Sequence, residues 1–316
     1  KGHKELFGMK RNIIVICGPT AVGKTKYAIE IAEALGGEIV SADSMQLYQF
    51  MDIGSAKPTQ EEQARCPHHL VDLIDPRIPF SVSMYQTLAK QAIEEIFDKG
   101  LIPVISGGTG LYVNSLLYEM DFSAPPGNEQ RRQELYYLAE KKGPELIHHM
   151  LTEIDADAAS RIHPNNLKKT IRALEAAENG KKIPDFKESF VKTKDYEAVL
   201  IGLTRERQEL YDRINQRVDQ LLEAGLAEEV QHLLDMGLTE NHISMKGIGY
   251  KEFISYFSGN CTFEETVRLI KQNTRHLAKR QLTWFKRYND IKWFNISQYR
   301  DDENCIEVII HWLKKL

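Results

Sequence analysis

One short stretch limits the fold of this chain more than any other. Residues Gly18–Thr25 read GPTAVGKT, which matches the phosphate-binding pattern GxxxxGK[ST]. The apolar run Asn12–Cys17 precedes this loop, and a segment with helical periodicity from Lys24 to about Leu35 follows it and ends at two glycines. A strand before the loop and a helix after it form the context in which such a loop holds a phosphate group. The sequence therefore predicts a strand, a phosphate-binding loop and a helix in this order.

The same order of strand and helix returns along the chain. Apolar runs at 38–43, 102–108 and 198–203 are predicted strands, and the segments at about 83–99 and 205–224 have helical periodicity. Strands that alternate with helices indicate a doubly wound α/β domain with a mainly parallel sheet. We therefore predict a P-loop core of the α/β class.

The middle of the chain breaks this alternation, because no convincing strand appears between about 118 and 190. Four stretches with helical character fill it, at 129–142, 145–153, 155–162 and 165–179. This indicates an all-helical insertion between two strands of the core. The predicted organisation is a first core part over 9–117, the insertion over 118–192, and a second core part over 193–316 that ends in basic helices.

Composition excludes several classes of protein. The 316 residues, of which 42% are hydrophobic and 27% charged, are those of an ordinary globular protein, and no apolar run approaches the ~20 residues that span a bilayer. The four cysteines form no CxxC pair, so neither a zinc site nor a disulfide framework is indicated, and a cytoplasmic protein is expected. The net charge of −4 offers nucleic acid no overall attraction.

The basic residues are nevertheless unevenly distributed. Between Arg275 and Lys292, six basic residues that include Lys279 and Arg280 stand against one acid, with three aromatic residues among them. A second basic cluster spans 161–172. Such runs are usually solvated helix faces, and they are also the form that a nucleic-acid-binding patch takes.

The loop residues divide the work of binding phosphate. Gly18 and Gly23 let successive N–H groups converge on phosphate oxygens, Lys24 adds a positive charge, and Thr25 offers its hydroxyl to Mg²⁺. The candidate phosphate-binding residues are Gly18, Pro19, Thr20, Ala21, Val22, Gly23, Lys24 and Thr25. A nucleotide-driven motor also needs an acid at the end of a second buried strand, but here 107–110 reads GGTG. A motor or switch protein is therefore not indicated.

Other polar residues stand where predicted strands end. Asp43 follows the second strand, so we expect it beside the loop at the carboxyl edge of the sheet, where open α/β sheets bind ligands. There it can bind a metal or deprotonate an acceptor, and the alternative is a cap on the next segment. After it come Ser44, Met45 and Gln46, in a segment whose amide and hydroxyl groups suit a planar heterocycle.

Two further segments fall at the same edge. Thr109 lies in a second glycine-rich turn, where it is expected near a phosphate or a base unless the turn serves packing alone. Arg205 and Arg207 come just after a strand. Further along the same predicted helix, Arg213 and Arg217 are expected to be surface or salt-bridge groups.

Six motifs stand in order along the chain: GPTAVGKT (18–25), SADSMQLYQFMDIGSAKP (41–58), ISGGTGLY (105–112), RIHPNNLKKTIRALE (161–175), KGIGYKE (246–252) and TRHLAKRQLTWFKR (274–287). Together they resemble the bacterial tRNA dimethylallyltransferases, also called tRNA isopentenyltransferases, over about Met9–Trp293. Two departures are minor: Asn166 stands where the family commonly has Asp, and Lys169 where it has Arg. Neither touches the chemistry that the resemblance implies.

The resemblance implies a reaction. The family transfers a dimethylallyl group from dimethylallyl diphosphate to N6 of the adenosine immediately 3′ of the anticodon, mostly in tRNAs that read codons starting with U, and diphosphate is released. The loop, although it has the form of an ATP-binding motif, would then hold a prenyl diphosphate. Lys24, the loop N–H groups, Mg²⁺ and Arg207 would stabilise the leaving diphosphate, and Asp43 would take the proton from N6. Thr109 would contact the tRNA near the reacting base, and Thr20 would help to close the donor pocket.

The resemblance also implies contacts with the anticodon stem–loop, whose reacting base must be unstacked. The helical insertion would grip one side of that loop and the basic C-terminal segment would contact phosphates. The expected tRNA-binding residues are Asp43, Ser44, Met45, Gln46, Thr109, Arg131, Asn166, Leu167, Lys168, Lys169, Thr170, Arg275, Lys279 and Arg280. We expect a monomer that binds no membrane.

Three other functions remain open. A small-molecule or nucleotide kinase would use the same loop, Asp43 as base, and the insertion as a lid. A prenyltransferase that acts on free adenine nucleotides would have less use for the insertion and the basic segment. A non-catalytic RNA-binding adaptor would not need an intact loop together with Asp43. Asp43 itself could be a base, a metal ligand through water, or an anchor for adenine.

Overall fold

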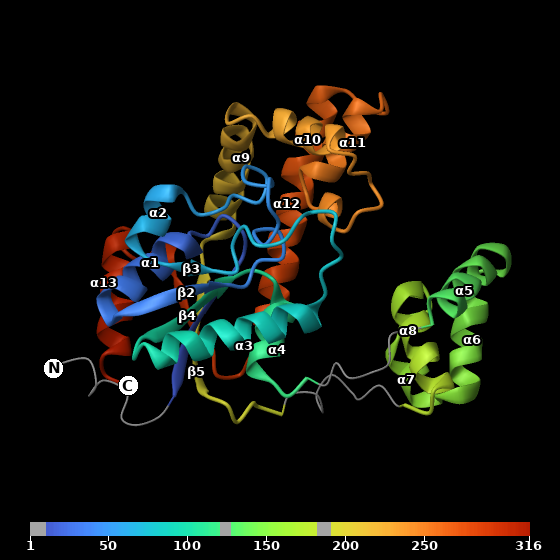
Figure 1. The fold of residues 1–316 in the computed structure, drawn as a ribbon, viewed down its shortest axis with the longest axis horizontal. Helices are drawn as coiled ribbons and strands as arrows, with labels where there is room; N and C mark the ends of the chain where they lie inside the picture. The colour runs from blue at the N-terminus through green and yellow to red at the C-terminus, as the bar shows by residue number, and fades with distance from the viewer. Residues whose placement is uncertain (1–10, 121–127, 182–190) are drawn as a thin grey trace. The chain divides into compact units, whose positions relative to one another are not determined.

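The computed structural model describes residues 11–120, 128–181 and 191–316 (Figure 1). The chain divides into two compact units. One combines the chain up to Leu117 with Thr193–Leu316, and the other is Tyr118–Lys192. None of the helices in the described part is long and apolar enough to cross a membrane.

The first unit is built on a sheet that has six strands in its described residues, and all neighbouring strands are parallel. The spatial order is β3-β2-β4-β1-β5-β6. The strands are β1 Asn12–Cys17, β2 Gly37–Ser41, β3 His68–His69, β4 Ile102–Gly107, β5 Glu197–Thr204 and β6 Lys292–Asn295. Cys17 at the end of β1 pairs in register with Gly107 of β4 and Gly202 of β5. The carboxyl ends of these strands therefore reach one edge of the sheet, and the predicted α/β class is confirmed.

β1 lies between β4 and β5 because its sequence allows burial on both faces. Each residue from Ile13 to Cys17 is at most 1% exposed. A continuous apolar run of this kind is typical of a central strand in a parallel sheet, since helices cover both of its faces.

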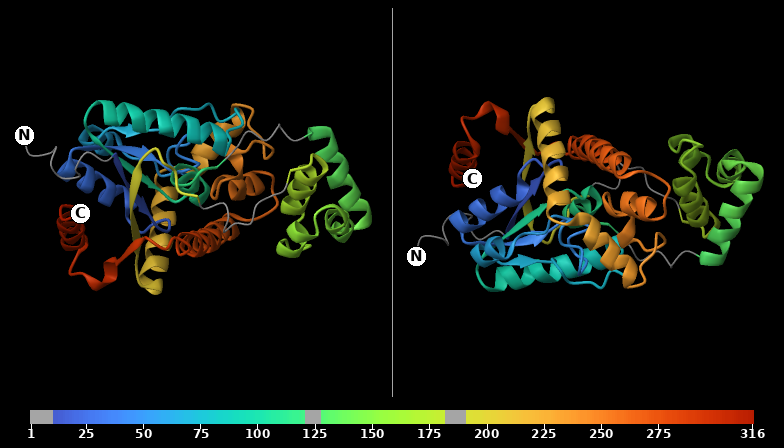
Figure 2. Two further views of the ribbon diagram at one scale, coloured as in Figure 1. Left: turned by 90° about the horizontal axis from the view of Figure 1, so that it is seen from below. Right: turned by 90° about the horizontal axis from the view of Figure 1, so that it is seen from above.

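Helices cover the sheet on both sides (Figure 2). α3 (Val82–Asp98) lies on one face, and α1 (Lys24–Leu35) and α13 (Asp302–Leu313) lie on the other. The other helices of this unit are α2 Gln60–Arg65, α4 Gly110–Leu117, α9 Arg207–Glu223, α10 Leu226–Asp235, α11 Tyr250–Phe257 and α12 Phe263–Phe285, with the short 3-10 helices η1 Ser244–Lys246 and η2 Ile296–Gln298. Buried side chains of α1, α9 and α13 form one core with those of β1 and β5.

The second unit is helical. It contains α5 Glu129–Lys142, α6 Pro144–Ile154, α7 Ala156–Arg161 and α8 Leu167–Glu178. These helices share a small core that includes Leu135, Ile147 and Leu174. Three of them begin at a side-chain cap, from Asn128, Asp155 and Asn166. The sequence thus sets where each of these helices starts.

Candidate active site

The loop from β1 to α1 is shaped by its glycines. Gly18 lies against β5, where a Cβ would be 2.5 Å from the carbonyl oxygen of Leu203. Gly23, with a φ of 114°, is the N-cap of α1, and neither a side-chain cap nor an acidic residue occupies the first turn. The N–H groups of that turn are therefore open to an anion, which the dipole of α1 also favours.

Lys24 lies across this loop. Its Nζ donates to the carbonyl oxygens of Gly18 at 3.1 Å and Pro19 at 2.8 Å. Burial lowers the pKa of Lys24 to about 8, and the negative charge of Asp43 opposes this shift. A partly buried ammonium whose hydrogen bonds go to neutral carbonyls is stabilised when a phosphate binds beside it.

Thr25 follows, and its hydroxyl makes no hydrogen bond within the described part of the chain. The same residues contain no group of three or more His, Cys, Asp or Glu that could hold a metal ion. Mg²⁺ commonly takes its ligands from substrate phosphates and water, with few from protein. A free hydroxyl at the loop fits a Mg²⁺ ion held in this way.

Two arginines hold the loop in place: Arg205 directly follows β5, and Arg213 belongs to α9. Arg205 Nε donates to the carbonyl oxygen of Val22 at 3.1 Å, and its guanidinium also pairs with Glu209 and Asp302. Arg213 Nε donates to the carbonyl oxygen of Ala21 at 3.0 Å. The prediction that Arg213 is a surface or salt-bridge group is therefore wrong, because this side chain holds the loop.

Arg217 lies one turn further along α9, on the same face as Arg213. Burial lowers the pKa of Arg217, and the negative charge of Asp43 opposes this shift. The positive charge of Arg217 in turn helps to lower the pKa of Lys24. No hydrogen bond or ion pair to Arg217 exists among the residues described. The expected salt bridge is therefore not formed within the described residues, and the half-buried guanidinium, whose charge acts on Lys24 and Asp43, can receive an anion.

Arg207, predicted to contact the leaving diphosphate, lies elsewhere. It is the exposed first residue of α9, and its guanidinium lies over the ring of Tyr211 at 5.2 Å from the ring centre. Among the described residues its side chain makes no hydrogen bond or ion pair with the loop. Arg217, which is half-buried and whose charge acts on Lys24, is better placed than Arg207 for that role. Periodicity puts Arg217 next to the buried Val218, but it does not tell which neighbour that side of the helix meets.

Asp43 stands after β2 with one carboxylate oxygen engaged. Its Oδ1 accepts the N–H of Met45 at 2.9 Å. The other oxygen has no hydrogen-bond partner in the described ranges. The carboxylate interacts electrostatically with the positive charges of Lys24 and Arg217. Asp43 thus closes a turn with one oxygen and presents the other at the sheet edge.

The turn after β4 is tied to the same segment. Thr109 Oγ1 accepts the N–H of Ser44 at 3.0 Å, and the Thr109 N–H donates to the carbonyl oxygen of Ala42 at 3.1 Å. Gly107 packs so closely on the backbone of Ala42 that a Cβ has no room. Thr109 therefore stands beside Asp43's segment, as its position in the sequence predicts.

Gln46, predicted to read the base, is used within the protein. Its Oε1 accepts from the hydroxyl of Ser41 at 3.0 Å, and its Nε2 donates to the carbonyl oxygen of Ala56 at 3.3 Å. Met45 packs against Gly247, where a Cβ would be 2.6 Å from Met45 Cε. The side chains of Gln46 and Met45 thus help to hold the conformation of this segment.

Gln281 of α12 is a site residue that sequence reasoning missed. Its Oε1 accepts the N–H of Thr20 at 2.8 Å, and its Nε2 donates to the carbonyl oxygen of Gly108 at 3.0 Å. Trp284, one turn later, fills the space beside Gly110. The available signal in the sequence was that Gln281 and Trp284 are three residues apart, which puts them on the same face of one helix. Gln281 joins the phosphate-binding loop to the turn that carries Thr109.

The basic residues of α12 differ among themselves. Arg275 donates from Nη1 to Asn215 Oδ1 at 2.7 Å, so it ties α12 to α9. Lys279 and Arg280 are exposed and form no ion pair within the described residues. These two can contact phosphate, whereas Arg275 already serves packing between helices.

The predicted tRNA-binding residues of the helical unit also differ in exposure and pairing. Arg131 is paired with Glu178 at 2.7 Å, and the side chain of Asn166 caps α8. Lys168 and Lys169 are exposed. Thr170 is fully buried and its hydroxyl donates to the carbonyl oxygen of Asn166 at 3.1 Å, so the predicted contact between its side chain and tRNA is wrong.

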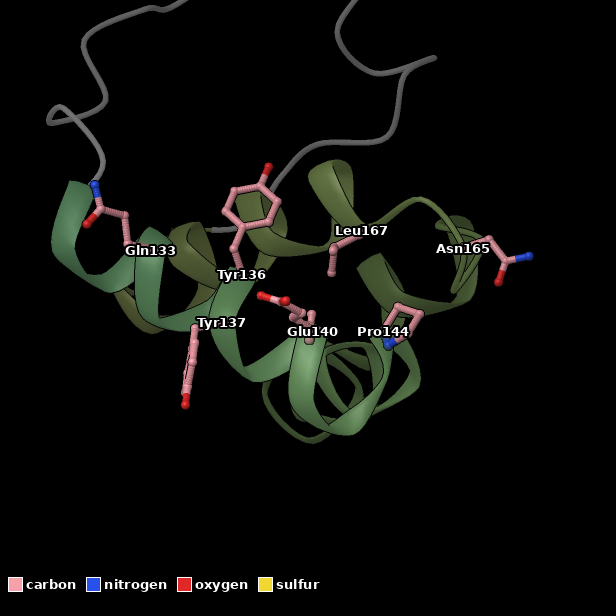
Figure 3. A pocket seen from close by; sticks show the side chains of 8 residues that line it. Gln133, Tyr136, Tyr137, Glu140, Pro144, Asn165 and Leu167 are labelled. Carbon is pink, nitrogen blue, oxygen red and sulfur yellow. The ribbon is translucent and has the colours of Figure 1, made fainter. Parts of the chain in front are cut away.

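Leu167 lines a shallow cavity of about 710 Å³ in this unit, shown in Figure 3. Tyr136 and Tyr137 of α5 stand at it, 40% and 61% exposed, and Asn165 lies near the start of α8. Exposed aromatic rings are surfaces on which an unstacked base can lie.

A phosphate-binding loop with cations and a carboxylate beside it, at the carboxyl edge of a parallel sheet, is the kind of site that a transferase with a phosphorylated donor uses. The family model described as IPP transferase matches residues 46–288, and that described as isopentenyl transferase matches 11–70. The tRNA dimethylallyltransferases of Alkaliphilus oremlandii and Clostridioides difficile are 50% and 47% identical to the chain, in each case over 96% of this chain and 97% of the relative. The chain belongs to the tRNA dimethylallyltransferase family.

Solved structures of tRNA prenyl transferases are also similar to this chain. The tRNA isopentenylpyrophosphate transferase of Bacillus halodurans matches with a TM-score of 0.72 and 42% identity, over 97% of both chains. A eukaryotic dimethylallyltransferase acting on tRNA matches with a TM-score of 0.79 and 28% identity, over 95% of this chain and 78% of that one.

Proposed function

We propose that this protein transfers a dimethylallyl group from dimethylallyl diphosphate to N6 of the adenosine immediately 3′ of the anticodon, in tRNAs that read codons starting with U, and releases diphosphate. The observation that carries the proposal is the placement of a carboxylate with one free oxygen beside two cations at a phosphate-binding loop. We infer tRNA as the acceptor and a prenyl group as the transferred group from the names of the relatives.

The donor side binds the diphosphate. When the allylic C–O bond breaks, negative charge grows on the leaving diphosphate. The open N–H groups of α1, Lys24 and Arg217 stand ready to stabilise that charge, and they need no reorganisation to do so. This proposal gives Arg217 the role that the sequence assigned to Arg207.

Mg²⁺ is part of this proposal. Thr25 would hold it through its free hydroxyl, together with the phosphates of the donor and water. When bound, Mg²⁺ would lower the energy of the leaving diphosphate as a Lewis acid.

The acceptor side delivers adenine N6. N6 attacks C1 of the dimethylallyl group as the C–O bond breaks, and a proton of N6 passes to the free oxygen of Asp43. Thr109 lies on the same side, where its hydroxyl already fixes the N–H of Ser44. Positioned proton transfer of this kind contributes roughly 10²–10⁴ in rate.

The remaining contacts are with the anticodon stem–loop. Lys168 and Lys169 of the helical unit, and Lys279 and Arg280 of α12, offer exposed positive charge for phosphates. We propose a monomer that acts on tRNA in the cytoplasm, and its four cysteines are free thiols.

Transfer of radiolabel from dimethylallyl diphosphate tests the proposal. The acceptor is unmodified tRNA with an adenosine 3′ of the anticodon, with Mg²⁺ and without ATP. AMP alone and ATP with AMP replace the tRNA in parallel reactions. Label in tRNA alone supports the proposal. Label in AMP indicates a prenyltransferase of free nucleotides, and phosphate transfer from ATP indicates a kinase.

A further inference from the structure

The segment that follows Asp43 forms a closed loop that ends in a turn at Asp52–Gly54. Phe50 and Ala56, which flank this turn, have φ of 63° and 47°, in the left-handed region that residues other than glycine seldom adopt. Such a backbone persists only where its surroundings hold it. The structure must therefore contain something that holds this turn.

Glu229 of α10 supplies that hold. Its Oε2 accepts the N–H groups of Asp52 at 2.8 Å and Ile53 at 2.7 Å, and its Oε1 accepts that of Gly54 at 3.0 Å. Three successive N–H groups that converge in this way form an anion-binding concavity. Here the anion is a carboxylate of the protein itself, and its bonds are charge-assisted.

Tyr250 completes the contact. Its hydroxyl donates to Glu229 Oε1 at 2.8 Å, and its fully buried ring lies against Gly54, where a Cβ would be 2.5 Å from the ring. Gly247, three residues earlier, receives Met45. The segment 246–252 thus supports both ends of the loop, which gives the KGIGYKE motif a structural reason.

The turn is connected to the site through Gln46. The amide of Gln46 bridges Ser41 at the end of β2 and Ala56 beside the turn. A shift at Asp52–Gly54 would therefore reach the residues directly after Asp43. The phosphate-binding loop makes none of these contacts.

We propose that Glu229 is a positioning residue for the acceptor side of the reaction: by holding the Asp52–Gly54 turn, it fixes the segment that carries Asp43 against the incoming base. This inference rests on the proposed function. It concerns the acceptor alone, because the donor loop is braced separately by Arg205, Arg213 and Gln281.

Glu229→Gln tests the proposal, since it keeps the size of the side chain and removes the charge and one acceptor oxygen. We expect kcat/KM for tRNA to fall at least about tenfold, while KM for dimethylallyl diphosphate stays within about twofold. Amide hydrogen exchange of the protein alone should become faster at 52–54 and remain the same at 18–25. Glu228→Gln, which removes the neighbouring exposed charge, should match wild type in all of these measurements.

Tyr250→Phe is the second variant, because it removes one of the four hydrogen bonds and keeps the ring; it should change kcat/KM for tRNA in the same direction by about threefold. A KM for dimethylallyl diphosphate that rises by as much as kcat/KM for tRNA falls, or unchanged exchange at 52–54, would overturn the positioning role. If wild type itself transfers no prenyl group to tRNA, the proposed function fails and this role fails with it. If wild type is active and Glu229→Gln equals it, the inference alone fails.

Discussion

The phosphate-binding loop and the helical unit hold their candidate residues in opposite ways. At the loop, Lys24, Arg205 and Arg213 are all bonded to backbone carbonyls before any substrate is present. In the helical unit, Lys168 and Lys169 are exposed on the first turn of α8. A preorganised site stabilises charge without reorganisation, whereas flexible lysines contribute a screened attraction. We therefore expect large effects on chemistry from the first region and small, salt-dependent effects on binding from the second.

Asp43→Ala should produce the largest effect. It removes the proposed proton acceptor, so kcat should fall by about a hundredfold or more while tRNA affinity changes little. Single-turnover rates and equilibrium tRNA binding, measured on the same preparation, check this. Equal losses in rate and affinity would mean that Asp43 anchors adenine and is not the base.

The second prediction separates two arginines of α9. Arg217→Gln should raise KM for dimethylallyl diphosphate by about ten- to a hundredfold, because it removes a charge-assisted contact with phosphate. Arg207→Gln should stay near wild type, since Arg207 lies over Tyr211 at the surface.

Thermal unfolding sharpens this comparison. Loss of an unpaired, half-buried charge does not weaken a fold, so Arg217→Gln should keep or raise Tm even as donor binding weakens. A lower Tm together with an unchanged donor KM would give Arg217 a structural role and return Arg207 to consideration.

The strands show which parts of the structure could be predicted from the sequence. The strands β1, β2, β4 and β5 could be predicted because each is an apolar run bounded by glycines or polar turns. β3 and β6, of two and four residues, could not, because such short strands exist only through pairing with a neighbour. Motif reading likewise placed the loop, Asp43 and Thr109, whose positions follow from where strands end.

Side chains on helices were harder to assign. Arg213 and Arg217 flank a buried stripe of α9, and sequence alone does not say which side of that stripe meets the loop. Gln46 has the amide that a base-reading residue needs, yet both ends of that amide are bonded within the protein. Such roles depend on packing between distant segments, which periodicity does not encode.

The third prediction concerns pH at the loop. The pKa of Lys24 is lowered to about 8 by burial, so its ammonium is present below that pH and lost above it. KM for dimethylallyl diphosphate should therefore rise by up to about tenfold over the pH unit above 8. Steady-state kinetics at saturating tRNA measure this. Lys24→Arg should abolish the rise, because arginine stays charged throughout. A donor KM that does not change with pH in wild type would mean that Lys24 does not bind the diphosphate.

The smallest effect is expected from the helical unit. Replacement of Lys168 and Lys169 by alanine should weaken tRNA binding by a few fold and lower the slope of log K against log salt by about two, one for each lost phosphate contact. The donor KM should not change. Arg131→Ala is the matched control, because Arg131 is already paired with Glu178 and should alter the slope less. If Arg131→Ala changes the slope as much as the two lysines together, the paired arginine is the RNA contact, and ion pairs within this unit do not predict which of its charges meet phosphate.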